Sequence, residues 1–246
     1  MNILEVKKVT QRFGELRAVD DLSFTVEKGE VFGIAGPNGA GKSTLFNMIT
    51  GFYRYTGEII FDNINITKLR PHQICHKGIA RTFQIPQLFL TLPVSDNLRV
   101  GAHFGAQSGA RTHDVAGEEE NIKEVIDLLG LSGKEDVLTS HLCLYDKKLT
   151  MLAVALATKP KLLLVDEPIG GLSPTETKQF MGLIQKINKE SGLTIIIIEH
   201  LMKALTALSK RMMIIENGKR IALDTPEKVC CDERVIETYL GRGKHA

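Results

Sequence analysis

Hydrophobic residues near the start of the chain follow the two patterns that predict β-strands. The segment NILEVKKV (2–9) alternates between apolar and polar residues, as a strand with one buried face does. The segment LSFTVEKGEVFGIAG (22–36) predicts a strand, a turn at Lys28-Gly29, and a second strand that ends at Ala35. The second strand is almost wholly apolar, which indicates a place inside a core.

Two later segments are apolar without alternation. KLLLVD (161–166) and LTIIIIE (193–199) have the composition of strands that are buried on both faces, as in a parallel sheet. GEIIFDN (57–63) predicts another short strand, and Asn217-Gly218 predicts the turn of a hairpin. The chain therefore combines buried parallel strands with antiparallel hairpins.

Helical spacing appears between these strands. KSTLFNMITG (42–51) predicts a helix that stops at Gly51. In the segment 173–192, apolar residues lie on one helical face, and Ser173 and Pro174 stand where an N-cap and a first-turn proline belong. Strands that alternate with helices in this way indicate an α/β fold.

The middle of the chain has a different pattern. From about residue 86 to residue 157 it is helical, with a break at GAHFGAQSGARTHDVAG (101–117) that predicts a mobile loop. The expected organisation is a single domain, 1–246, in which an α/β core (1–85 and 158–246) is interrupted by a helical insertion (about 86–157).

Composition excludes several classes of protein. The net charge of +2 over 246 residues gives no broad basic surface for nucleic acid. The four cysteines form no CxxC pair, which is typical of reduced, cytosolic proteins. The longest apolar runs are far shorter than the ~20 residues of a membrane span, and charges occupy the N-terminus where a signal peptide needs an apolar run.

The strongest chemical signal is GPNGAGKST (36–44), which fits the pattern G-x-x-x-x-G-K-[ST]. It follows a predicted strand and opens a predicted helix, which is the context that a phosphate-binding loop requires, and a chance glycine-rich turn is the weaker interpretation. Backbone N–H groups of such a loop curl around phosphates, and the helix N-terminus adds positive potential. Lys42 is expected to reach the β- and γ-phosphates and Ser43 to bind Mg²⁺. The expected nucleotide-binding residues are Gly36, Pro37, Asn38, Gly39, Ala40, Gly41, Lys42, Ser43 and Thr44.

A pair of carboxylates supplies the second signal. Asp166 ends the buried strand KLLLVD, at the edge where α/β sheets bind ligands, and is expected to hold Mg²⁺. Glu167 follows directly and can act as general base toward an attacking water. A simple acidic pair at a strand end is the alternative, but the phosphate-binding loop in the same chain favours the catalytic interpretation.

With these motifs the whole chain resembles the ATP-binding subunits of ABC transporters. The resemblance implies a P-loop NTPase (RecA-like) core with a mainly parallel sheet, an N-terminal antiparallel β subdomain and an inserted helical subdomain. It also implies the cofactors ATP and Mg²⁺. Gln84 in RTFQ resembles the glutamine that contacts the metal and the attacking water, and His200 resembles the histidine that contacts the γ-phosphate. Phe13 resembles the aromatic residue that stacks on adenine, and GGLSP (170–174) weakly matches the D-loop.

The closest subfamily resemblance is to the ATPases of branched-chain amino acid importers. It rests on RPHQICHKGIARTFQIPQLF (70–89) and on the C-terminal VIETYLG. It implies membrane permease subunits, a second ATP-binding subunit in a head-to-tail homo- or heterodimer, and, indirectly, a solute-binding protein, with no nucleic acid. The expected location is cytoplasmic and peripheral, on the inner face of the cell membrane. Importers of urea or short amides share much of the pattern, so the solute stays open.

One expected motif is degenerate. LCLYD (142–146) stands where the family has a signature such as L-S-G-G-Q, which meets the γ-phosphate bound by the partner subunit. Cys143 replaces the serine and Tyr145 replaces a glycine that permits close backbone approach. Asp146 replaces the glutamine and can cap the following helix, which would place a carboxylate near phosphate.

Two functions remain open at this stage. The first is a transport motor, in which ATP binding closes a dimer, hydrolysis opens it, and a permease responds. The alternative is a nucleotide-gated subunit that hydrolyses little ATP, because the segment 142–146 serves a partner's nucleotide poorly. A soluble ABC factor acting on nucleic acid is disfavoured by the near-neutral charge and the single domain.

Overall fold

The computed structural model describes residues 1–105 and 115–240. The chain divides into two compact units, the first formed by Met1–Pro71 with Asn188–Ala246 and the second by His72–Ile187. The predicted bounds of the helical insertion stay a prediction.

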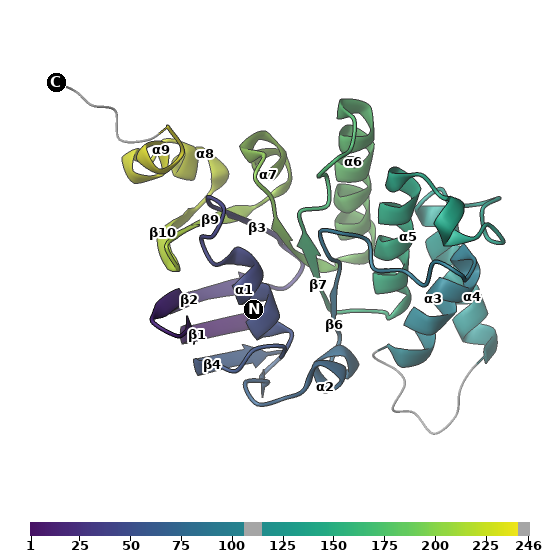
Figure 1. Cartoon of the computed structure of the whole chain (residues 1–246), viewed down its shortest axis with the longest axis horizontal. Helices are drawn as coiled ribbons and strands as arrows, with labels where there is room; N and C mark the ends of the chain where they lie inside the picture. Colours follow the sequence, from purple (N-terminus) through teal and green to yellow (C-terminus); the bar gives the residue numbers. More distant parts are fainter. Residues whose placement is uncertain (106–114, 241–246) are drawn as a thin grey trace. The chain divides into compact units, whose positions relative to one another are not determined.

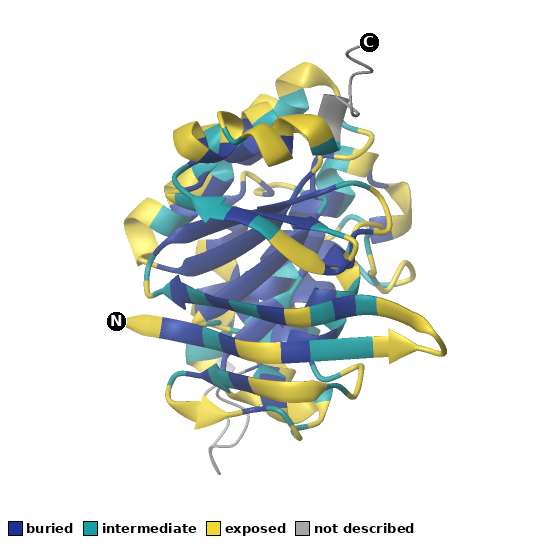
Figure 2. Ribbon diagram, turned by 90° about the vertical axis from the view of Figure 1, so that its left-hand side faces the viewer, coloured by how far each residue is buried: buried dark blue, intermediate teal, exposed yellow. Residues whose placement is uncertain are grey.

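An antiparallel sheet forms the N-terminal part of the first unit. Its strands, in the order β2-β1-β4-β5, are β2 (Leu16–Glu27), β1 (Asn2–Phe13), β4 (Thr56–Phe61) and β5 (Ile64–Asn65). Buried and exposed residues alternate along β1 and β2 (Figure 2), which agrees with the alternation in the sequence. This is the predicted N-terminal antiparallel sheet.

A second set of strands in the first unit contains the buried apolar runs. In the order β10-β9-β3-β8, its strands are β10 (Lys219–Asp224), β9 (Arg211–Glu216), β3 (Val31–Ala35) and β8 (Thr194–Ile198). β3 pairs in parallel with both β8 and β9, and every residue of β3 and β8 is buried. The predicted hairpin is present, with Asn217 at φ 49° and Gly218 at φ 76°.

Short helices complete the first unit (Figure 1): α1 (Lys42–Ile49), α7 (Met202–Leu208), α8 (Pro226–Cys230) and α9 (Glu233–Leu240). α1 buries Leu45, Phe46, Met48 and Ile49. Gly51, at φ 77°, follows its last turn, as the sequence predicts.

The second unit contains a parallel pair of strands and most of the helices. β6 (Ile79–Arg81) pairs in parallel with β7 (Leu162–Asp166). The helical elements are α2 (Pro71–His76), α3 (Val94–Phe104), α4 (Val115–Leu128), the 3₁₀ turn η1 (Thr139–His141), α5 (Leu144–Ala157) and α6 (Pro174–Ser191), whose last turn belongs to the first unit. α3, α4 and α5 lie side by side (Figure 1). The middle of the chain is therefore helical, as predicted.

The prediction of a glycine-rich loop at 101–117 is partly wrong. α3 continues to Phe104 and α4 begins at Val115, so both ends of the predicted segment 101–117 are helical. Gly101 permits close packing rather than a break, because a Cβ there would meet the Val154 carbonyl oxygen of α5 at 2.5 Å. The rest of the predicted loop, 106–114, lies outside the described residues.

Helix α6 begins with a reciprocal cap. The Glu176 N–H donates to Ser173 Oγ at 3.3 Å, and the Ser173 N–H donates to Glu176 Oε2 at 2.8 Å. The predicted N-cap at Ser173 is confirmed, with Pro174 as the first helical residue.

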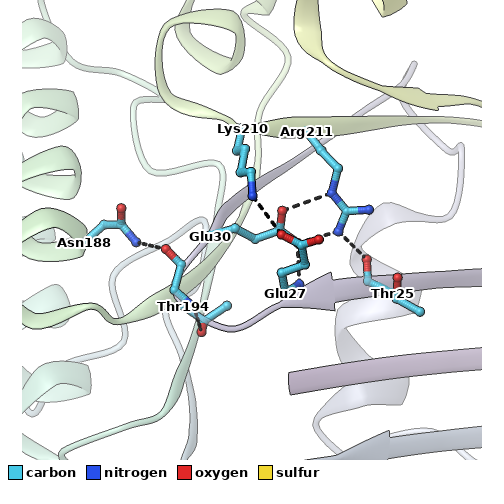
Figure 3. A network of polar contacts seen from close by, with 8 residues as sticks. Thr25, Glu27, Glu30, Asn188, Thr194, Lys210 and Arg211 are labelled. Carbon is cyan, nitrogen blue, oxygen red and sulfur yellow. Dashed lines mark hydrogen bonds and ion pairs between the residues drawn. The ribbon is translucent and has the colours of Figure 1, made fainter. Parts of the chain in front are cut away.

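A polar network joins the β2–β3 turn to the start of β9 (Figure 3). The Arg211 guanidinium donates to Glu30 at 2.6 and 3.1 Å and to the Thr25 carbonyl at 2.9 Å. Lys210 bonds the neighbouring Glu27 at 2.8 Å. Donation to the Glu30 carboxylate raises the pKa of the Arg211 guanidinium. The Glu30 side chain is only 1% exposed, so its charge is balanced inside the protein.

The fold class is therefore α/β, with a mainly parallel core and an antiparallel N-terminal sheet, as predicted. No helix in the described ranges is long and apolar enough to cross a membrane.

Candidate functional site

The predicted phosphate-binding loop connects β3 to α1 and is closely packed at two glycines. A Cβ at Gly36 would meet the Ile215 carbonyl oxygen at 2.0 Å, and one at Gly41 would meet the Ala18 carbonyl oxygen at 2.2 Å. Gly41 also has φ 103°, which side chains rarely adopt. Only glycine fits at these two positions, so the backbone itself forms the lining of the loop.

Lys42 is the buried cation of this loop. It is 5% exposed, and its Nζ donates to the carbonyl oxygens of Gly36 at 2.7 Å and Pro37 at 3.0 Å. The loop therefore curls around the ammonium group. Asn38, Gly39 and Ser43 are exposed at the surface of the loop. A cation and the N-terminus of α1 are thus held at one place, which suits an anion such as phosphate.

His200 lies at the same edge of the strands as the phosphate-binding loop. β3 and β8 are parallel neighbours with Ile34 opposite Ile198, so residues that follow their carboxyl ends emerge together. The Glu199 N–H donates to the Ile34 carbonyl at 3.3 Å, and the His200 N–H donates to Glu199 Oε2 at 3.2 Å. The structure brings His200 to the edge where the loop begins, although the two are far apart in sequence.

Phe13 ends β1 and packs against a second aromatic residue. The ring of Tyr53 meets it edge to face, with centroids 5.2 Å apart and planes at 80°. Phe13 is 44% exposed, so part of its ring remains open to solvent. An exposed ring that a neighbour holds in place can stack on a planar base.

Asp166 ends β7 and is paired with an arginine. Arg81 Nη2 contacts Asp166 Oδ2 at 2.7 Å, and the two side chains are 7% and 6% exposed. Arg81 ends the neighbouring parallel strand β6, so the pairing of the strands sets the ion pair. Within the described part of the chain, Asp166 Oδ1 accepts no hydrogen bond, which leaves one carboxylate oxygen available.

Glu167 and Gln84 form the second pair of contacts in this unit. Gln84 Nε2 donates to Glu167 Oε2 at 2.6 Å, although the two residues are 83 positions apart. Glu167 has φ 45°, a left-handed conformation that is unusual for a non-glycine residue and marks an abrupt turn after β7. Gln84, Asp166 and Glu167, which the sequence predicts for one site, are thus brought together.

The chemistry of these donors fits Mg²⁺. This ion prefers oxygen ligands and uses few carboxylates when phosphates supply the rest. Within the second unit, Asp166 Oδ1 and the Gln84 amide oxygen are ligands of this kind. No group of three or more His, Cys, Asp or Glu residues able to hold a metal occurs in the described residues. The donors therefore suit an ion that arrives with phosphate ligands.

The segment 142–146 differs from one expectation. Helix α5 begins at Leu144 with Cys143 as its N-cap residue, so Asp146 lies inside the first turn. The prediction that Asp146 caps the helix is wrong, because the helix begins at Leu144 and not at Lys147, three residues earlier than the sequence suggested. Instead, Asp146 Oδ2 pairs with Lys134 Nζ at 2.6 Å. A carboxylate in the first turn still suits the helix dipole, and Lys134 balances its charge.

Leu144 lies beside Gly171, and Tyr145 lies near the carboxylate of Glu176. Burial, followed by the nearby carboxylates of Asp146 and Glu176, raises the pKa of Tyr145. A Cβ at Gly171, which has φ 79°, would lie 3.0 Å from Leu144 Cδ2. Bulky side chains therefore occupy the start of α5, and no side-chain hydrogen bond caps that helix.

Three residues at these sites were missed from the sequence: Arg81, Tyr53 and Lys134. Arg81 had a usable signal, because it directly precedes the TFQ of the predicted Gln84 motif. Tyr53 and Lys134 had none, since only tertiary packing brings them to Phe13 and Asp146.

Comparison with known proteins identifies the family of the chain. Residues 19–170 match the family model described as "ABC transporter". The chain is 35% identical to the high-affinity branched-chain amino acid transport ATP-binding protein BraF of Pseudomonas aeruginosa, over 97% of this chain and 98% of that protein. It is 33% identical to the corresponding protein LivG of Escherichia coli K12, with the same coverage.

Solved structures give the same result. A nucleotide-free ATP-binding cassette from an ABC transporter is 32% identical, with a TM-score of 0.87 over 98% of this chain and all of that one. The ADP conformation of an ATP-binding cassette of an ABC transporter is 33% identical, with a TM-score of 0.88 over 98% and 99% of the two chains. On its sequence and its fold, this chain belongs to the ABC transporter family.

Proposed function

We propose that this chain is the ATP-binding subunit of an importer and couples ATP binding and hydrolysis to solute movement through a membrane permease. The glycine-lined loop around Lys42 is the observation that carries the ATP-binding part of this proposal. The full-length similarity to branched-chain amino acid transport ATP-binding proteins supports a branched-chain amino acid, or a related small amino acid or amide, as the solute.

Nucleotide binding is assigned to the first unit. The loop 36–44 would hold the phosphates through its backbone N–H groups, with Lys42 exchanging its two carbonyl contacts for phosphate oxygens. Phe13 would stack on adenine, and Tyr53 would hold the Phe13 ring in place. The exposed His200 would contact the γ-phosphate, since it follows the strand next to the loop.

Hydrolysis is assigned to Glu167, with Gln84 as its neighbour. Glu167 would accept the proton of the attacking water, and the hydrogen bond from Gln84 would orient its carboxylate. Asp166, Gln84 and Ser43 would hold Mg²⁺, which neutralises charge on the phosphates when it is bound. These roles follow from the motifs, and the contacts within each unit support them.

A head-to-tail dimer with a second ATP-binding subunit is part of the proposal. In such a dimer, the segment 142–146 of this chain would face the nucleotide held by the partner. With Cys143 and Tyr145 in place of serine and glycine, it would stabilise that nucleotide less well than a complete signature. The site at this chain's own phosphate-binding loop retains its residues. A partner with a complete signature would therefore give one fully competent site.

The permease contact is assigned to the segment that follows Gln84. Ile85 is 70% exposed, and Phe89 and Leu90 are exposed as well, although all three are large apolar residues. Apolar groups concentrated in a short exposed segment favour a protein contact. Such a contact would place this chain on the inner face of the membrane and would link the permease to Gln84.

Reconstitution tests the function as a whole. The chain would be co-expressed with candidate permease and ATPase subunits, purified as a complex and placed in vesicles. Uptake of labelled leucine that requires ATP and the matching binding protein is the expected result, with urea as the comparison solute. Failure to purify with any permease, or solute uptake that proceeds without ATP, would contradict the proposal.

A further inference from the structure

We propose that Arg81 is the counter-ion that keeps Asp166 from binding a divalent cation until a nucleotide arrives. The inference rests on the proposed function, because it concerns the carboxylate that would hold Mg²⁺ with ATP. It assigns a role to Arg81, a residue outside the expected set of site residues.

The ion pair between Arg81 and Asp166 is built into the strands. The two residues end the neighbouring parallel strands β6 and β7, and Nη2 lies 2.7 Å from Oδ2. Both side chains are nearly inaccessible to solvent, at 7% and 6% exposure. A buried ion pair differs from a surface pair in the effect of losing one partner. The charge that remains is buried and cannot be hydrated.

The guanidinium is also held from a second direction. Its central carbon lies 4.8 Å from the centre of the Phe83 ring, two residues further along the chain. Stacking on a ring suits the planar guanidinium and restricts its movement. Arg81 is therefore positioned to keep its charge beside Asp166, since arginine does not lose its proton in proteins.

Charge balance decides what the available oxygen can bind. The pair Arg81–Asp166 is close to neutral, so a cation that approaches Oδ1 gains little net attraction and meets the nearby guanidinium. The adjacent carboxylate of Glu167 is engaged by Gln84. Polyphosphate supplies the negative charge that the protein lacks at this point, so the cation is expected to bind together with the nucleotide.

The competing explanation is that Arg81 only ties β6 to β7. The two explanations predict opposite changes in metal affinity when Arg81 is replaced. If Arg81 is a structural tie, replacing it disturbs Asp166 and weakens metal binding. If Arg81 is the counter-ion, replacing it with a neutral residue leaves a buried carboxylate unbalanced, and a divalent cation then binds more tightly.

Binding of Mn²⁺ to the purified full chain, followed by electron paramagnetic resonance at pH 8, separates these explanations. Wild type, Arg81→Met, Arg81→Gln and Arg81→Lys would be titrated without nucleotide and with a non-hydrolysable ATP analogue. We expect wild type and Arg81→Lys to bind Mn²⁺ tightly only with the analogue. Arg81→Met and Arg81→Gln should bind Mn²⁺ alone at least about tenfold more tightly than wild type. Adding Asp166→Asn to Arg81→Met should remove that gain.

Two results would overturn the inference. One is wild type that binds Mn²⁺ alone as tightly as it does with the analogue. The other is a folded neutral variant that binds Mn²⁺ alone no more tightly than wild type. Arg81→Gln, which can still donate to Asp166, covers the case in which Arg81→Met does not fold. Equilibrium dialysis of the wild-type chain with the ATP analogue in the absence of metal tests the proposed function separately. A chain that does not bind the analogue would refute the proposed function. The comparison of Mn²⁺ affinities measured without nucleotide would be unaffected by that result.

Discussion

Lys134 and Asp146 form an ion pair across 2.6 Å at the start of helix α5. The Asp146 carboxylate is therefore balanced by a side chain from the preceding loop and does not cap the helix. This arrangement alters the interpretation of the degenerate signature. Asp146 contributes less free negative charge than its position in the sequence suggested, so the substitutions at Cys143 and Tyr145 carry more of the difference.

Restoring the signature should increase hydrolysis. The variant would combine Cys143→Ser, Leu144→Tyr, Tyr145→Gly and Asp146→Gln. We expect ATP turnover by the isolated protein to rise about tenfold, because backbone and hydroxyl donors would again face the partner's γ-phosphate. Steady-state phosphate release at saturating ATP and Mg²⁺ measures this change.

The control for the restored signature adds Glu167→Gln to it. Turnover should then fall to background, which would show that the gained activity uses this chain's own carboxylate. Equal rates for wild type and the restored variant would mean that LCLYD already serves as a working signature.

The packing of the phosphate-binding loop predicts different effects at two glycines. Gly41→Ala should lower the free energy of unfolding by about 2–4 kcal/mol, since its Cβ would clash with the Ala18 carbonyl at φ 103°. Gly39→Ala meets no atom within 4 Å and should cost only about 1 kcal/mol for its φ of 78°. Chemical denaturation measures both changes. Equal stabilities of the two variants would show that the loop is not closely packed at Gly41.

Adenine stacking predicts an effect that depends on the base. Phe13→Ala should weaken ATP binding about tenfold, which is the contribution to affinity expected from stacking one aromatic ring on a base. Phe13→Tyr keeps an aromatic ring and should bind ATP as wild type does. Inorganic tripolyphosphate, which has no base, should bind Phe13→Ala and wild type equally. If the alanine variant loses affinity for both ligands, Phe13 acts through the structure of β1 and not through the base.

The network in Figure 3 predicts a difference between buried and exposed charges. Glu30→Ala removes the partner of Arg211 and should destabilise the protein by about 2–3 kcal/mol. Glu27→Gln weakens only the exposed contact with Lys210, so its Tm should stay near that of wild type. Thermal unfolding of the two variants checks this order. A Glu27→Gln variant as unstable as Glu30→Ala would contradict the assigned burial.

Local patterns predicted much of the fold. The uninterrupted apolar runs 161–166 and 193–199 identified buried parallel strands, and Ser173 with Pro174 identified the start of α6. The ends of α3 and α4 could not be predicted, because Gly101 serves close packing against α5 and glycine alone does not reveal that use.

The candidate site was predictable where chemistry and spacing coincide. The loop 36–44 and the pair Asp166 and Glu167 have characteristic neighbours in sequence. Lys134 has none, since it meets Asp146 only through loop packing. Arg81 precedes the predicted Gln84 motif, but its pairing with Asp166 arises only through strand pairing.

Single-turnover hydrolysis by Glu167→Gln tests the central claim, that this chain hydrolyses ATP with Glu167 as general base. The substitution removes the carboxylate but keeps an oxygen that can accept the 2.6 Å hydrogen bond from Gln84. With excess complex over labelled ATP, we expect the rate of bond cleavage to fall at least about 100-fold, because general-base catalysis is lost. ATP affinity, measured in the same samples, should stay within about threefold of wild type, which corresponds to a change in binding free energy of less than about 1 kcal/mol. Cleavage at the wild-type rate with unchanged affinity would contradict the claim.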